Sequence, residues 1–89
     1  MNLGTLKLYA LAYSSAFALQ LWFDVAAYAA NHKEYTVGIL VSLTYPLIAM
    51  IPMVLVINAQ STSMRFRLAA VEGLGYATAT GIFFVVRDS

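Results

Sequence analysis

Three long apolar segments dominate this sequence and limit what the chain can fold into. They cover about residues 8–30, 36–57 and 68–86, and a helix of roughly 20 residues crosses the hydrocarbon core of a bilayer. None of the segments alternates strictly between apolar and polar residues, and a membrane β-barrel needs more strands than this chain can supply. The sequence therefore predicts an all-α integral membrane protein, with residues 1–89 forming a single transmembrane domain.

Composition indicates that lipid is the solvent of these segments. Of the 89 residues, 62% are hydrophobic and 10% are charged, whereas a soluble domain is about half apolar and about a quarter charged. A soluble fold of this size would have too little polar surface to cover its core, so we expect the lipid bilayer to surround it. The net charge of +1 provides no basic field, and we expect no nucleic-acid partner.

Short polar connections predict how the helices are arranged. Residues 31–34 separate the first two segments, and residues 58–63 separate the last two. Connections this short make sequential helices antiparallel neighbours, which predicts an antiparallel bundle of three transmembrane helices. A two-span arrangement stays open as the alternative. The first and third segments carry the acids Asp24 and Glu72, so one of these segments can lie in the membrane interface instead.

Basic residues near the segment ends predict the orientation. Three spans place Lys7, Arg65 and Arg67 on one side of the membrane, and Lys33 and Arg87 on the other. Because lysine and arginine favour the cytoplasmic side, we expect a cytoplasmic N-terminus and a C-terminus on the opposite side.

A cleaved leader is the alternative for the first segment. Lys7 precedes its apolar run, and Ala27, Tyr28 and Ala29 have the small-x-small form of a signal-peptidase site. The run is longer than the usual core of a signal peptide, and Asp24 lies just before the cut. We therefore expect the segment to be retained.

A polar pair lies inside the first segment. Gln20 and Asp24 are four residues apart, so their side chains are neighbours on one face of a helix. Polar groups within a membrane turn toward the interior of a bundle. We expect Asp24 to be hydrogen-bonded to Gln20 or to a tyrosine, or to extend toward Lys33. The functional alternative is a proton-accepting carboxylate.

A second acid, Glu72, lies about one turn inside the third segment. We expect it to pair with a base at the cytoplasmic edge, namely Lys7, Arg65 or Arg67, because a paired charge is the cheaper arrangement in a membrane. Three spans place Asp24 and Glu72 at different depths, so we do not expect a shared carboxylate site. Two stations of a proton path are the alternative.

Small residues give the third segment its clearest packing signal. They recur every four positions, at Ala69, Gly73, Ala77 and Gly81. Small residues at this spacing let two helix backbones approach closely, so we expect this face to meet another helix. Gly75 and Ala79 form a second small pair beside it. The pattern leaves open whether the other helix belongs to this chain, to a second copy or to another protein.

Two prolines, Pro46 and Pro52, interrupt the second segment. Each removes a backbone donor, and transmembrane helices tolerate such positions as bends. We expect helix kinks that fit a neighbouring helix, with a hinge as the functional alternative.

Catalytic and cofactor motifs are missing from the sequence. There is no Ser-His-Asp order at a suitable spacing, no HExxH and no phosphate-binding glycine loop, so we expect no catalytic residues and no enzyme. His32 is the single histidine and lies in a polar connection. Ligation of haem or a pigment needs an apolar pocket and is the minor alternative to a solvated side chain, so we expect no metal and no cofactor.

These features favour a small accessory or structural subunit that packs against the helices of a larger membrane complex. The alternative is a self-associating pore or lesion former, in which the small-residue face is a contact between copies and the helix face with Gln20 and Asp24 lines water. A small proton-coupled transport subunit that uses Asp24 and Glu72 is a third possibility. The chain resembles phage holins and accessory subunits of respiratory and photosynthetic complexes in size and topology only.

Overall fold

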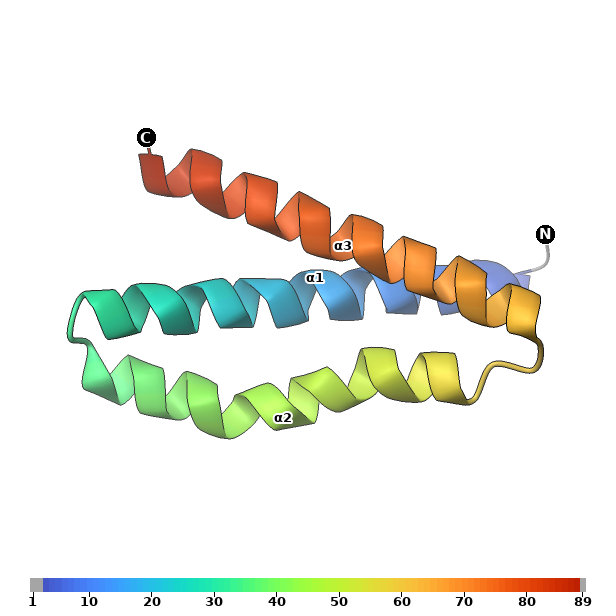
Figure 1. Ribbon diagram of the computed structural model, residues 1–89, viewed down its shortest axis with the longest axis horizontal. Helices are drawn as coiled ribbons and strands as arrows, with labels where there is room; N and C mark the ends of the chain where they lie inside the picture. The colour runs from blue at the N-terminus through green and yellow to red at the C-terminus, as the bar shows by residue number, and fades with distance from the viewer. Residues whose placement is uncertain (1–2, 89) are drawn as a thin grey trace.

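The computed structural model describes residues 3–88, and these residues form three helices joined by two short turns (Figure 1). The helices are α1 (Leu3–Asn31), α2 (Tyr35–Ile57) and α3 (Thr62–Asp88). The all-helical prediction is therefore confirmed. Of the three, α2 and α3 are long and apolar enough to cross a membrane.

Two of the helices begin earlier than their apolar segments. Helix α1 begins at Leu3 and α3 begins at Thr62, several residues before the predicted starts at 8 and 68. At α3 the cause is local, because the Ser61 hydroxyl accepts a hydrogen bond from the Met64 backbone N–H at 3.1 Å. A serine in this position satisfies one of the free donors of the first turn and so fixes the start of a helix. Polar residues thus extend α3 beyond its apolar part.

The turn after α1 reverses the chain within three residues. Lys33 has a φ of 58°, in the left-handed region that commonly ends a helix. The Glu34 backbone N–H then bonds to the carbonyl of Ala29 at 2.9 Å, which satisfies one of the last free acceptors of α1. Helix α2 begins at the next residue, Tyr35.

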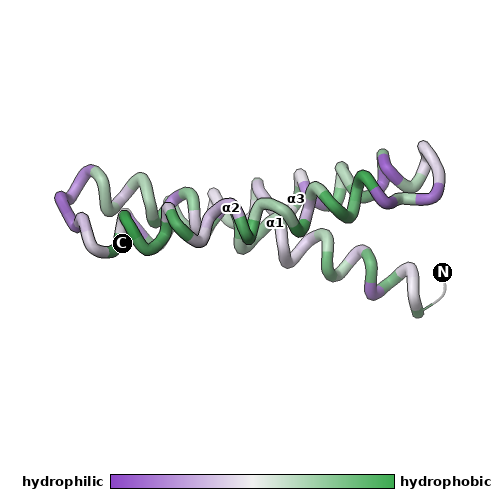
Figure 2. Tube along the Cα trace, turned by 90° about the horizontal axis from the view of Figure 1, so that it is seen from below, coloured by the Kyte–Doolittle hydropathy of each residue, from purple (hydrophilic) through white to green (hydrophobic). Residues whose placement is uncertain are grey.

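Helix α1 is the central element of the fold. In Figure 1 it lies between α3 and α2, and α2 runs antiparallel to the other two helices. Helix α1 packs against both α2 and α3, whereas α2 and α3 touch only a little. The molecule measures 45 × 28 × 19 Å, and the edge-on view shows how thin the layer is (Figure 2). The three helices therefore form a flat layer with α1 in the middle.

Small residues bring α1 and α3 together. Ala12, Ala16 and Ala79 are fully buried. A Cβ atom added at Gly75 would lie 2.6 Å from the Tyr13 carbonyl oxygen and 3.1 Å from the Ala16 Cβ. The backbones are thus too close at Gly75 for any side chain, which is the packing that small residues allow between membrane helices. From this contact α3 diverges from α1 toward its C-terminus (Figure 1).

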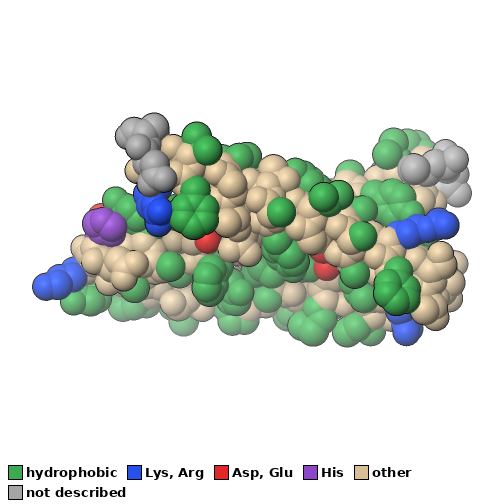
Figure 3. Space-filling view, turned by 45° about the horizontal axis from the view of Figure 1, so that its top comes forward, with side chains coloured by type: hydrophobic (Ala, Val, Ile, Leu, Met, Phe, Trp, Pro, Cys, Tyr) green, Lys and Arg blue, Asp and Glu red, His purple; other side chains and the backbone are tan. Residues whose placement is uncertain are grey.

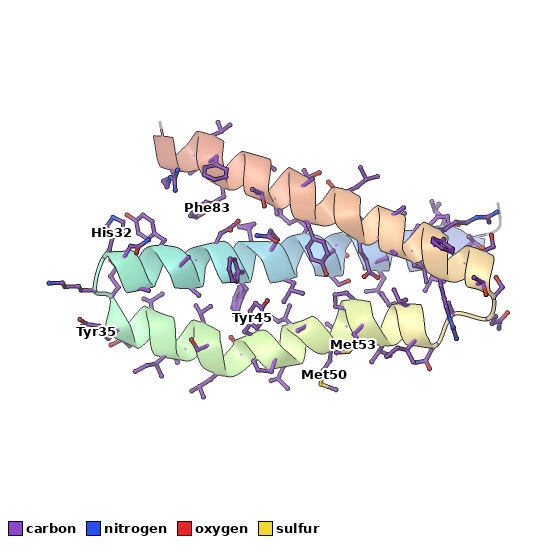
Figure 4. All side chains as sticks on the ribbon, in the orientation of Figure 1. His32, Tyr35, Tyr45, Met50, Met53 and Phe83 are labelled. Atoms are coloured by element: carbon purple, nitrogen blue, oxygen red, sulfur yellow. The ribbon has the colours of Figure 1, made fainter. Side chains whose placement is uncertain are left out.

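Larger and more polar side chains join α1 to α2. The Trp22 indole N–H donates a hydrogen bond to the Thr44 hydroxyl at 2.6 Å, and the Phe23 and Tyr45 rings lie 6.4 Å apart. Figure 4 shows Tyr45 between the two helices, whereas Met50 points away from the layer. The α1–α2 contact is therefore looser than the α1–α3 contact and depends on side chains.

Helix α2 runs without interruption through both prolines. Pro52 is buried, while Pro46 is exposed. Apart from Pro52, Val41 is the only buried residue of this helix. Helix α2 is thus the most exposed of the three and contacts α1 along a narrow strip of its surface.

The close contact at Gly75 predicts a position-specific effect of adding one methyl group. We expect Gly75→Ala to lower the free energy of unfolding by about 1–3 kcal/mol, because the added Cβ overpacks the contact with the α1 backbone. The control is Gly73→Ala, where no described atom beyond its own turn lies within 4 Å of the added Cβ and the gain in helix propensity is the same. Unfolding of both variants in mixed detergent micelles measures the difference, and equal stabilities would contradict it.

Candidate functional site

Helix α3 carries small residues on two different faces. The inner face, toward α1, buries Leu68, Glu72, Gly75 and Ala79. The four residues of the predicted packing stripe are instead exposed: Ala69, Gly73, Ala77 and Gly81. We call these four residues the outer ridge. The contact within the chain therefore uses the second small pair and leaves the outer ridge uncovered.

The outer ridge is open along its length. Cβ atoms added at Gly73 and at Gly81 would meet no atom within 4 Å in residues 3–88, outside their own turns. The same test at Gly75 finds three atoms within about 3 Å, all from α1. The outer ridge thus has the backbone accessibility of a helix-packing face without a helix of this chain against it.

The polar pair in α1 is formed as expected. The Gln20 amide Nε2 donates a hydrogen bond to Asp24 Oδ1 at 3.1 Å. The other oxygen, Oδ2, is buried and has no hydrogen-bond partner among the described residues. Asp24 therefore keeps one unused acceptor inside the layer, which a bound water, a proton or a donor from a partner can satisfy.

Glu72 differs from the expectation of a paired charge. It is 6% exposed, and its Oε2 atom is buried without a hydrogen-bond partner in the described part of the chain. Lys7, Arg65 and Arg67 are exposed, and none of these three forms a salt bridge with it within residues 3–88. The Glu72 side chain lies on the buried inner face of α3, whereas the three bases are exposed.

The two acids are well separated, as expected. Gly75 contacts Ala16, Asp24 lies eight residues beyond Ala16 along α1, and Glu72 lies three residues before Gly75 along α3. Because α1 and α3 run in the same direction, these offsets add, to about 16 Å at a rise of 1.5 Å per residue. Asp24 and Glu72 are therefore two separate sites.

The divergence of α3 from α1 opens a cleft that the sequence did not reveal. The cleft has a volume of about 230 Å³, and Asp24, Asn31, His32 and Arg87 contribute to its lining. The Arg87 guanidinium lies over the Phe84 ring, with its carbon 4.7 Å from the ring centroid. Predicting this cleft requires the register of α1 against α3, which the separate segments do not contain.

His32 is fixed at the rim of this cleft. Its ring stacks on Tyr28 with centroids 3.9 Å apart, and its Nδ1 lies 2.9 Å from the Tyr28 carbonyl oxygen. Because a carbonyl oxygen only accepts, Nδ1 carries the hydrogen and Nε2 is left to face solvent or a ligand. Figure 4 shows His32 at the end of α1, with Phe83 between α3 and α1. Residues 3–88 contain no cluster of three or more histidine, aspartate or glutamate side chains that could hold a metal ion.

The Gln20–Asp24 hydrogen bond predicts a coupling energy between the two residues. We expect Gln20→Leu to destabilise the protein by about 1–3 kcal/mol, because Asp24 then has no donor for either oxygen. The double variant Gln20→Leu, Asp24→Leu removes both polar groups, and we expect it to be more stable than Gln20→Leu alone. Unfolding in mixed micelles provides the double-mutant cycle, and strictly additive effects would show that the bond contributes nothing.

Comparison with protein-family models, with curated proteins and with solved structures gives no significant match. A function for the chain is therefore argued from the geometry of its three helices and from the chemistry of the residues that they expose or bury.

Proposed function

We propose that the chain is a three-span membrane protein that serves as a small accessory or structural subunit of a larger membrane complex. In this proposal the N-terminus is cytoplasmic, the C-terminus lies on the opposite side, and the outer ridge of α3 packs against a transmembrane helix of a partner. The observation that carries the proposal is the outer ridge itself, which has the spacing of a close helix contact and is covered by no helix within residues 3–88.

The distribution of side chains on the surface supports the membrane location. Large apolar side chains such as Leu43, Leu47 and Val85 are about 70% exposed, and they lie along the sides of the layer. Figure 3 shows lysine and arginine side chains at the two ends of the long axis, with apolar side chains between them. The long dimension of 45 Å is close to the full thickness of a bilayer with its headgroups.

The position of α1 supports three spans over two. Helix α1 has no continuous stretch as apolar as those of α2 and α3, yet it packs lengthwise between these two helices, which are long and apolar enough to cross a membrane. Moving α1 to the membrane surface would expose the small residues and Glu72 of the α1–α3 contact to lipid. The two polar groups in its middle, Gln20 and Asp24, satisfy each other in part, which lowers the cost of inserting them.

The flat shape supports a role in a larger assembly. With few contacts between α2 and α3, the layer has two broad faces and does not enclose a core of its own. Membrane helices associate through close packing of small residues and through hydrogen bonds between helices. The outer ridge, on a helix at the edge of the layer, supplies the first of these without any rearrangement of the chain.

Labelling of single cysteines tests the number of spans, and the chain has no cysteine of its own. We expect Gly4→Cys and Ser63→Cys to react with an impermeant maleimide from the cytoplasmic side, and Asn31→Cys from the opposite side. If α1 lies in the interface, it stays on the side where α2 begins, so Gly4→Cys reacts from the same side as Asn31→Cys. If α3 lies in the interface instead, Arg87→Cys reacts from the same side as Ser63→Cys, whereas three spans place it on the opposite side. Gly4→Cys and Arg87→Cys together therefore decide between the two-span and three-span arrangements.

Loss of association in outer-ridge variants tests the docking face. We expect the double variant Gly73→Leu, Gly81→Leu to lose its larger partners after extraction in mild detergent, because the leucines hold the partner backbone away. The control is Thr78→Leu, an exposed change on the same helix outside the outer ridge. Native mass spectrometry gives the composition of the wild-type particle and of both variants.

Three outcomes of this measurement are informative. A fixed ratio of this chain to larger and different subunits, lost only in the double variant, supports the accessory subunit. A ring or ladder of this chain alone supports the self-associating pore former instead. Unimpaired assembly of the double variant would remove the outer ridge as the docking face.

A further inference from the structure

Glu72 is the buried ionisable group that the proposed docking role leaves unused. It lies on the inner face of α3, one turn before Gly75, whose nearest neighbours on α1 are Tyr13, Ala16 and Phe17. Because α1 and α3 run in the same direction, Glu72 lies beside the part of α1 about one turn before these residues, which includes the fully buried Ala12.

A charged Glu72 has nothing to balance it in this position. Its Oε2 atom accepts no hydrogen bond from residues 3–88, and Lys7, Arg65 and Arg67 are exposed rather than buried beside it. An ionised carboxylate that is buried without a partner is strongly disfavoured, and such a group is neutralised instead. Acids within membrane helices that lack a paired base are commonly sites of proton binding.

We propose that Glu72 is a proton-binding site within the α1–α3 contact, and that it holds its proton as a neutral carboxylic acid at neutral pH. The proposal rests on the proposed membrane span of α3. The ligand is a proton, and the carboxylic acid hydrogen donates to an acceptor on the walls of the contact.

The titratable groups around Glu72 are tyrosines. Tyr76 lies one turn further along α3, where it interacts electrostatically with Glu72 and with Tyr45 of α2. On α1 the titratable side chains along this part of the helix are Tyr9 and Tyr13, one turn apart, and Tyr13 stacks on Phe17 with ring centroids 6.3 Å apart. All four tyrosines are half-buried, and a neutral tyrosine hydroxyl both donates and accepts. The surroundings therefore suit a neutral acid and lack the cation that a carboxylate requires.

Two other occupants fit these residues less well. A metal ion needs several oxygen or nitrogen ligands, and residues 3–88 bring no three histidine, aspartate or glutamate side chains together. A proton shared between two carboxylates needs them in contact, whereas Asp24 lies about 16 Å away along the helices. The proton at Glu72 is therefore held by one carboxyl group alone.

The amino-acid composition makes this site directly observable. Glutamate occurs only at Glu34 and Glu72, so labelling glutamate with carbon-13 at Cδ gives two carboxyl signals in the whole chain. Glu34 lies exposed in the turn between α1 and α2 and serves as the internal reference for a solvated side chain. The measurement is solid-state NMR of the full chain in lipid bilayers over a range of pH.

We expect the Glu72 signal to stay at the chemical shift of a carboxylic acid at neutral pH, well separated from that of Glu34. The signal disappears in Glu72→Gln and is unchanged in Asp24→Asn, since the two acids do not share the proton. Should Glu72→Gln fail to fold, Glu34→Gln assigns the two signals by removing the other one.

A Glu72 signal at the carboxylate position at neutral pH would overturn the proton site. So would a shift of that signal in Asp24→Asn, which would show that the two acids are coupled. The side on which Arg87→Cys reacts reports separately whether α3 crosses the membrane. A carboxylate signal from a protein with the expected labelling pattern therefore overturns the proton site alone and leaves the proposed docking role standing.

Discussion

The close approach of α1 and α3 at Gly75 determines how the rest of the molecule is arranged. With the Tyr13 carbonyl and Ala16 directly opposite, this position admits no side chain. Packing this tight fixes the rotation of α3 about its own axis, because a turn of the helix in either direction would drive a larger residue into α1. The fixed rotation in turn places Glu72 inside the contact and directs Gly73 and Gly81 outward.

The buried acid and the exposed ridge are therefore two results of the same contact. Small residues spaced around α3 allow both faces to approach another backbone, and only one of these faces is used within the chain. The proposed docking surface and the proposed proton site lie on different sides of one helix. A partner that packs on the outer ridge does not need to displace Glu72 or the α1 side chains that cover it.

Much of the secondary structure follows from the sequence, because apolar length and short polar turns leave few alternatives. The start of α3 does not, since it depends on the Ser61 cap, which continues the helix into polar residues. The Gln20–Asp24 bond was predictable because it is local, within one turn. The isolation of Glu72 and the cleft at Arg87 were not, because both depend on the register and rotation of α3 against α1.

The flat cross-section has a consequence for the proposed membrane arrangement. A section of 28 × 19 Å has a long perimeter for its area, so in that arrangement most helix residues lie at the boundary with acyl chains. In such a layer the lateral pressure and the thickness of the bilayer act on each helix individually. Helix α2 has few buried residues and contacts α1 along a narrow strip, so it has the least internal packing to resist them. Within a bilayer, a change in lipid composition therefore alters the fold mainly by changing the tilt of α2 relative to α1.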